Sequence, residues 1–329
     1  MFFGFPEQAR ELRAGVRDVL STACTPATVR AAWPGGDPAM VTALWRTLGE
    51  LGLTGLVVPA DDGGLGLDEL TLVAALQEVG YAGAPGPVVE TVAVAAPLLA
   101  AAGALPDGLL DGLLDGSVQV AVQRGEVVPY AASAHLVLQL DGDTARLLSR
   151  ADAELEPVAT VDGSRSAARV LGTGTVLDVS GRAVAQAQLR GVVGTAAVLL
   201  GLGRRMLEIT TAYVRERHQF GVPVGSFQAV KHPLADALVR LEFAEPAVLR
   251  AAQSLRTRDT DAGLHAWMAK ALASDAAWQV AGATLQAHGA MAYTIEYDLQ
   301  LFAKRAWALA ADWGTAGEHR ERIARTLFS

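Results

Sequence analysis

The sequence predicts a mainly helical α+β protein in which a small β domain lies between two helical domains. Apolar residues recur every three or four positions up to about residue 116, alternate with polar ones between 117 and 182, and return to helical spacing afterwards. Helices, then strands, then helices are typical of α+β chains. We therefore expect an N-terminal helical domain at 1–116, a reduced middle β domain at 117–182 and a C-terminal four-helix domain at 183–329.

The N-terminal domain is predicted to be helical, with glycine and proline at the joints. Leu12, Val16 and Leu20 share one apolar stripe, and further helices are expected at 68–79 and 88–101. Between them, residues 59–66 form a glycine-rich turn. A phosphate-binding loop is a weak interpretation of this turn, because no strand-then-helix unit with an acidic residue follows it. A chain reversal explains it more simply.

The middle domain is predicted from alternation. Valines stand at every second position from 118 to 122, and the apolar run at 135–140 leads into Asp141-Gly142-Asp143, a hairpin turn signal.

The C-terminal domain is predicted to begin with two long helices flanking a short turn. The first presents an apolar face up to Tyr213, and the second begins after Gly221 and Pro223. Pro246 is expected to kink the second helix or end it early. A third helix follows around 264–285, and a fourth spans about 298–311.

Composition and charge exclude several classes of function. The chain has 329 residues, 51% hydrophobic content and a formal net charge of −8. Without a basic face it should bind neither nucleic acid nor an anionic membrane. Cys24 is the only cysteine, so no internal disulfide is possible and a cytoplasmic location is expected. The six histidines do not cluster as metal ligands do. No secretory signal is visible, and no apolar run reaches the roughly 18 residues that a membrane span needs.

The turn between the two long helices carries the candidate site. Arg217, Gln219 and Phe220 bring together a cation, an amide and an aromatic ring, a set suited to an anionic, ring-bearing ligand such as a nucleotide diphosphate. The commoner alternative is an arginine in a surface ion pair beside a phenylalanine in the helix corner.

Three segments resemble the acyl-CoA dehydrogenase family. The family's R-x-Q-F-G-x-P-x-x-x-F-Q signature stands here from Arg217 to Gln228. Its P-x-x-x-G-G-x-G turn is similar to residues 59–66, and its Q-x-x-G-G-x-G-Y-T-x-E segment to residues 286–296. The resemblance covers nearly the whole chain.

The resemblance implies FAD as cofactor and a CoA thioester as substrate. In this family a glutamate takes the α proton while a hydride passes to the flavin, and the R-x-Q-F-G turn of one subunit holds the FAD of its neighbour. Arg217 is thereby implied to pair with pyrophosphate and Phe220 to lie against adenosine. The residues implied to contact a shared FAD are Arg217, Gln219, Phe220, Val224, Phe227, Gln286 and Gly289.

Three departures from the family pattern shape the prediction. The T-E-P-x-x-G-S-D stretch that lines the flavin ring is absent from the middle domain. The two positions at which the family places its glutamate are occupied by Trp313 and Gly191, so we predict no catalytic residue in this chain. The third departure is at 289–292, where Gly-Ala-Met-Ala replaces G-G-x-G and leaves less room for adenosine.

The hypothesis is that this chain is similar to the smaller subunit of heterotetrameric actinobacterial acyl-CoA dehydrogenases of steroid side-chain degradation. A larger partner subunit would supply the flavin-ring wall and the glutamate. One alternative is a self-sufficient homomeric dehydrogenase with Asp312 as an atypical base. The other is a non-catalytic scaffold subunit without ligand contact.

Overall fold

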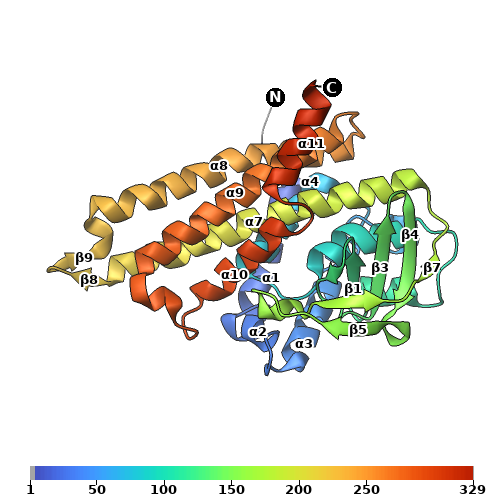
Figure 1. The fold of residues 1–329 in the computed structure, drawn as a ribbon, viewed down its shortest axis with the longest axis horizontal. Coiled ribbons are helices and arrows are strands. Elements are labelled where there is room, and N and C mark those ends of the chain that lie inside the picture. Colours follow the sequence, from blue (N-terminus) through green and yellow to red (C-terminus); the bar gives the residue numbers. More distant parts are fainter. Residues whose placement is uncertain (1–3, 329) are drawn as a thin grey trace.

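The computed structural model describes residues 4–328 and shows three successive parts, helical, β and helical, as predicted (Figure 1). Side-chain caps mark the starts of several N-terminal helices: Asp37 accepts from the Ala39 N–H, and Asp68 from the Thr71 N–H. The N-terminal helices are α1 (Glu7–Ala23), α2 (Pro26–Ala31), α3 (Pro38–Glu50), α4 (Glu69–Ala82), the π-helical turn η2 (Val89–Ala95), α5 (Ala96–Ala100) and α6 (Leu109–Leu114).

The middle part contains two small sheets. One has the order β1-β3-β4-β7, with β1 (Val120–Gln123), β3 (Leu136–Asp141), β4 (Thr144–Ser149) and β7 (Thr175–Val176). The other has the order β2-β6-β5, with β2 (Val127–Val128), β6 (Ala168–Leu171) and β5 (Glu154–Pro157). The predicted hairpin is confirmed, because Asp141 pairs with Thr144 across a turn in which Gly142 has a positive φ of 54°.

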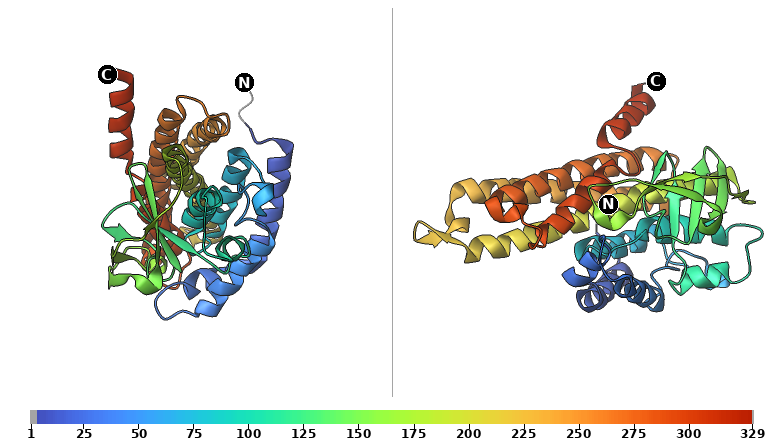
Figure 2. Two further views of the ribbon diagram at one scale, coloured as in Figure 1. Left: turned by 90° about the vertical axis from the view of Figure 1, so that its right-hand side faces the viewer. Right: turned by 60° about the horizontal axis from the view of Figure 1, so that its bottom comes forward.

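The C-terminal part is a bundle around α7 (Gly181–Glu216), α8 (Gln228–Arg256) and α9 (Ala262–His288). These helices run alongside one another, and the hairpin of β8 (His218–Gln219) and β9 (Val222–Pro223) lies at their far end (Figure 1). The predicted fourth helix is α10 (Leu299–Ala311). A further helix that the sequence analysis did not single out, α11 (Ala316–Phe328), projects from the body (Figure 2). The predicted fold class is confirmed, while the domain boundaries stay a prediction.

Pro246 does not end α8, which continues to Arg256 and also contains Pro233. Leu241, Ala244 and Val248 are buried around Pro246, so packing against the neighbouring helices holds the segment helical.

Helix α7 is the central core helix. Of the described residues, it forms the one helix that is long and apolar enough to cross a membrane by length and composition, and the expectation of no membrane span stays a prediction. However, 67% of that apolar window is buried inside the protein, as expected for a core helix.

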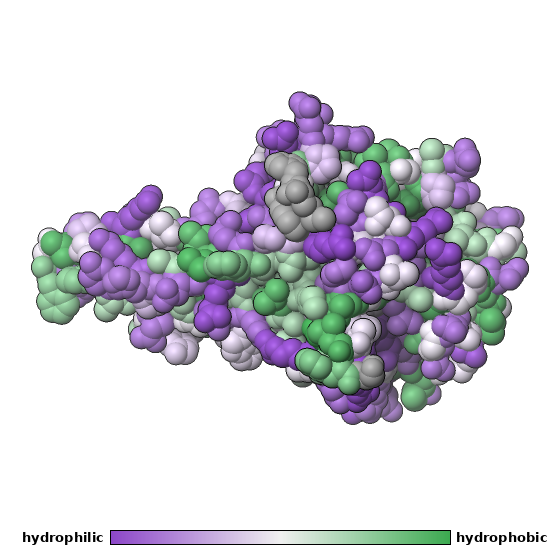
Figure 3. Space-filling view, turned by 90° about the horizontal axis from the view of Figure 1, so that it is seen from above, coloured by the Kyte–Doolittle hydropathy of each residue, from purple (hydrophilic) through white to green (hydrophobic). Residues whose placement is uncertain are grey.

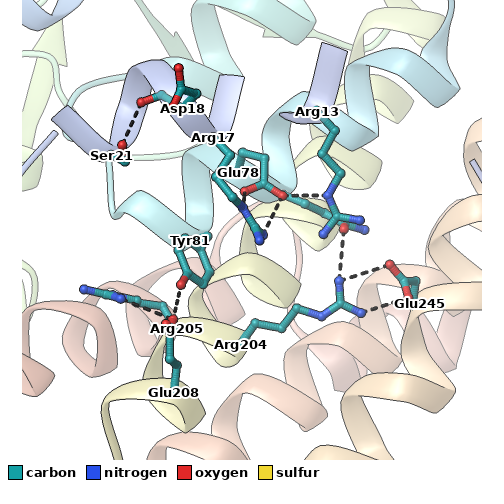
Figure 4. Close-up of polar contacts among 11 residues, drawn as sticks. Arg13, Arg17, Asp18, Ser21, Glu78, Tyr81, Arg204, Arg205, Glu208 and Glu245 are labelled. Carbon is teal, nitrogen blue, oxygen red and sulfur yellow. Dashed lines mark hydrogen bonds and ion pairs between the residues drawn. The ribbon is translucent and has the colours of Figure 1, made fainter. Parts of the chain in front are cut away.

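A partly buried polar network ties the first helix to the bundle (Figure 4). The Glu78 carboxylate on α4 accepts from the Nε atoms of Arg13 and Arg17 on α1, both at 2.6 Å. On α7, Arg204 donates to Gln77 and Glu245 at 3.3 and 2.8 Å. These contacts join α1, α4, α7 and α8.

A second buried pair joins the three parts of the chain. Arg305 on α10 donates to Asp162 Oδ2 at 2.6 Å, to the Ala84 carbonyl at 2.7 Å and to Ser164 Oγ at 2.6 Å. Both charged side chains are almost fully buried. The ion pair and the further hydrogen bonds compensate the cost of burying the two charges. Loss of Asp162 or Arg305 would therefore leave the other charge buried without a partner.

We predict that Asp162→Asn lowers the free energy of unfolding by about 3–5 kcal/mol, because it leaves the Arg305 charge buried without a counter-ion. Urea unfolding followed by circular dichroism measures this loss. The matched control is Glu321→Gln, which removes an exposed ion pair with Arg325 and should cost less than about 1 kcal/mol. Equal losses in the two variants would contradict the assigned role of the buried pair.

Candidate functional site

The Arg217 turn is a two-residue β-hairpin at the end of α7. His218 pairs with Pro223 and Gln219 with Val222, and the two residues between them have positive φ, 54° at Phe220 and 81° at Gly221. Glycine adopts this conformation without strain, but an aromatic residue does not. The hairpin therefore holds Phe220 in a strained conformation in which its side chain is 90% exposed.

Arg217 is fixed through its backbone, and its side chain stays exposed. Its N–H donates to the Tyr213 carbonyl at 2.9 Å, and its carbonyl accepts from the Val224 N–H at 2.7 Å. Among residues 4–328, the guanidinium takes part in none of the ion pairs. The alternative of a surface ion pair is therefore not found, and the cation is available to an anionic group.

The second segment of the candidate site lies beside the hairpin. Gln286 is exposed near the end of α9, and Gly289 follows it with a φ of 57°. The two segments are joined because the His288 ring stacks on Tyr213 at 4.2 Å between centroids. His288 also contacts the Thr284 carbonyl at 2.8 Å and the Tyr297 hydroxyl at 3.1 Å, so it serves packing and hydrogen bonding.

The end of the molecule formed by these segments carries exposed apolar side chains (Figure 3). Phe220 and Phe227 lie edge to face at 6.2 Å, and Tyr293 is 88% exposed. A cavity of about 410 Å³ next to the hairpin is lined in part by Arg215 and Lys231, two cations that the sequence analysis did not single out. The predicted contact residues are thus brought together at one end, and their role toward a cofactor stays a prediction.

The two positions expected to lack the glutamate lie against each other. A Cβ atom added to Gly191 on α7 would lie 2.4 Å from the Trp313 ring, so the indole occupies the space above this glycine. Trp313 is only 2% exposed and has a positive φ of 56°. Although the two positions are far apart in sequence, they share one site, and it contains an indole.

Two carboxylates lie near this indole. Asp312 is ion-paired with Arg165, and its Oδ1 accepts from the Trp313 N–H at 3.0 Å. Glu90, on η2, accepts from the Trp313 Nε1–H at 3.4 Å and is almost fully buried. Burial raises the pKa of Glu90 to about 7, and the Asp312 charge adds to the rise.

Glu90 was missed by the sequence analysis. A carboxyl with a pKa near neutrality is a candidate base, but this one lies beneath the indole and is not open to a ligand. The available sequence signal was one acidic residue inside the long apolar run at 88–101.

The middle domain is short at the place where the family's flavin-lining stretch would stand. Only residues 124–126 connect β1 to β2, so the strands join directly where the family stretch would stand. A hollow of about 520 Å³ lies between the β3–β4 hairpin, α7 and α11. Arg124 lines this hollow and also lies over the Trp313 ring, 4.4 Å from its centroid.

We predict that Glu90→Gln stabilises the protein in a pH-dependent way. Between pH 4.5, the ordinary pKa, and about 7, the unfolded chain releases the Glu90 proton while the folded chain retains it, so wild-type stability falls as pH rises. Glutamine does not titrate, so the advantage of the variant should grow across this window to about 3 kcal/mol and stay constant above it. Urea unfolding at pH 4.5, 6 and 8 measures this difference, and a difference independent of pH would contradict the raised pKa.

Comparison with known protein families finds two matches along the chain. The acyl-CoA dehydrogenase N-terminal domain matches residues 6–104, and the acyl-CoA dehydrogenase C-terminal domain matches residues 180–328. The chain is also 32% identical to acyl-CoA dehydrogenase IpdE2 of Mycolicibacterium smegmatis over 328 residues, which cover 98% of this chain and 99% of the relative.

Solved structures show the same fold. The ChsE4-ChsE5 complex from Mycobacterium tuberculosis superposes with a TM-score of 0.86 at 24% identity, covering 99% of both chains. The Tcur3481-Tcur3483 steroid ACAD G363A variant superposes with a TM-score of 0.84 at 28% identity, covering 97% of both chains.

Proposed function

The chain belongs to the acyl-CoA dehydrogenase family, and from that premise we propose that it is the smaller subunit of a heteromeric, FAD-dependent acyl-CoA dehydrogenase. In this proposal it supplies Arg217 and its neighbours to an FAD whose reactive ring lies in a larger partner subunit. That partner also carries the catalytic glutamate. FAD, when bound, accepts the hydride that leaves the β carbon of the CoA thioester.

The observation that carries the proposal is the distance between the two half-sites. In this proposal Gly191, on α7, marks the reaction site, and Arg217, which directly follows the last residue of α7, marks the cofactor-contact site. At 1.5 Å per residue they lie about 39 Å apart along the helix axis, farther than one extended FAD can reach. A cofactor held by Arg217 therefore has its reactive end in another chain.

The hairpin has the chemistry for half of such a contact. An exposed guanidinium can donate two parallel hydrogen bonds to a pyrophosphate, and the Phe220 ring can lie against adenine. Gln219 and Gln286 offer amide donors on either side. These groups are presented away from the core, as a contact with a partner's ligand requires.

The surface of α8 and α9 supports assembly with a partner. Large apolar side chains are exposed there, among them Phe243 at 76% and Trp278 at 58%, together with Leu238, Val239 and Leu272. Apolar surface of this kind marks protein–protein interfaces. The names of the two structural relatives each join two components, which favours a heteromeric partner, and one of them is a steroid ACAD. We therefore propose a bulky CoA thioester, such as a steroid side-chain acyl-CoA, as substrate.

A self-sufficient homomeric enzyme with Asp312 as base is less well supported. Both oxygens of Asp312 are engaged, one by Arg165 and the other by the Trp313 N–H. Asp312→Asn should therefore leave the turnover of the assembled complex within about twofold of wild type, measured with an acyl-CoA and a dye acceptor. A loss of several orders of magnitude, as expected for removal of a base, would favour the homomeric alternative.

We predict that Arg217→Ala weakens FAD binding by the co-purified complex by about 10- to 100-fold, because a charge-assisted contact to phosphate is worth about 1.5–3 kcal/mol. Flavin absorbance per complex after dialysis measures the retained FAD. The matched control is Arg182→Ala, an exposed arginine at the opposite end of α7, which should retain FAD fully.

The scaffold alternative predicts a different result. A scaffold subunit without ligand contact would lose no flavin in the Arg217→Ala complex. Stoichiometric FAD in that variant would therefore contradict the proposed function.

A further inference from the structure

The loop that carries Trp313 is held in place by buried groups on several sides. The Lys270 ammonium donates to the Ala310 and Gly314 carbonyls at 3.2 and 3.1 Å, and His319 Nε2 contacts the Trp313 carbonyl at 3.0 Å. Burial lowers the pKa of Lys270 to about 7 and that of His319 to about 4, so His319 is neutral and donates through Nε2. Lysine is rarely buried completely, and here the two carbonyls that flank the loop are among the acceptors of the buried ammonium.

The backbone of Trp313 is strained. Its φ of 56° lies in the left-handed region, where a bulky side chain is unfavourable by about 1–2 kcal/mol. The ring nevertheless packs against Gly191 and lies under Arg124, and its Nε1–H points to Glu90. Filling the core would not by itself require a tryptophan with a strained backbone next to a buried carboxyl. Strain of this kind is typical of positions with a functional role.

The ring is linked to the hollow beside it through Arg124. Arg124 lines that hollow and covers the indole, and Val192, which also lines it, is the chain neighbour of Gly191. Beyond the glycines of α7 the interior is apolar, since a Cβ at Gly194 would contact Leu76 and Val89. Toward solvent the hollow carries Arg322 and the Asp141 and Asp143 carboxylates. Removing the indole would leave a space bordered by Gly191 and by Arg124, which also lines the hollow.

We propose that Trp313 is a plug that closes this chain's own acyl-binding pocket, so that no CoA thioester reaches the space above Gly191. The inference rests on the proposed function, because it explains why one subunit of the pair does no chemistry. The occupant that the plug excludes is the acyl part of a CoA thioester, with its phosphates toward Arg124 and Arg322 and its chain toward the apolar interior.

Trp313→Gly in the full-length chain tests the plug. Glycine accepts the positive φ at this position, so the variant loses the ring and also loses the strain. Indole is the probe: it should enter the vacated space and raise the melting temperature of the variant toward the wild-type value. Octanoyl-CoA should then displace the indole, as followed by saturation-transfer NMR, whereas CoA alone should not.

Trp45→Gly is the matched control. Trp45 is a fully buried tryptophan that also lies against a glycine, Gly86, but in the N-terminal core. Its vacated space should take up indole as well, with no displacement by octanoyl-CoA. Any one of three results would overturn the proposal. These are that indole fails to bind folded Trp313→Gly, that octanoyl-CoA displaces indole equally from both variants, or that CoA alone displaces it.

A second pair of variants keeps the test decisive if Trp313→Gly does not fold. Gly191→Ala should lower the melting temperature of the wild-type chain, because the added methyl meets the ring. It should cost little in a Trp313→Leu background, where the shorter side chain leaves room. Equal losses in the two backgrounds would show that the ring does not fill this space. These variants do not involve Arg217, so the plug can fail while the proposed function stands. A failure of the proposed function would instead appear as full FAD retention in the Arg217→Ala complex.

Discussion

The continuity of α7 is the constraint on which this structure depends. One uninterrupted helix carries Gly191 near one end and leads into Arg217 at the other, so the two sites cannot move toward each other. Its middle is fully buried over residues 191–203 and is packed against α4, α8 and α9. The hairpin is consequently presented at a fixed place beyond the core, where it is suited to a ligand that another chain holds.

Polar groups are exposed at one end of α7 and buried at the other. At the Arg217 end, a cation, amides and aromatic rings are exposed, which is unfavourable for an isolated protein and favourable for an assembled one. At the Gly191 end, Glu90, Lys270, Arg165 and His319 are buried around Trp313. Such a concentration of buried ionisable groups is typical of functional sites, yet here it fixes a loop and encloses no open pocket.

The sequence predicted the architecture because the period of apolar residues records which faces are buried. It also predicted the Arg217 turn, since Gly221 and Pro223 are strong local signals for a chain reversal. It could not predict that Trp313 touches Gly191, because this contact depends on how two distant segments pack. The burial of Lys270 and Glu90 was hidden for the same reason: a charged residue in a helix reads as a surface residue unless the packing around it is known. The continuation of α8 through Pro246 shows tertiary packing overriding a local helix breaker.

The most direct test of the central claim is the structure of the co-purified complex with FAD bound. The account predicts that Arg217 lies within hydrogen-bonding distance of the FAD pyrophosphate while the isoalloxazine ring is held by the partner subunit. An isoalloxazine ring bound against residues 117–179 of this chain, with a carboxylate of the same chain beside it, would contradict the account.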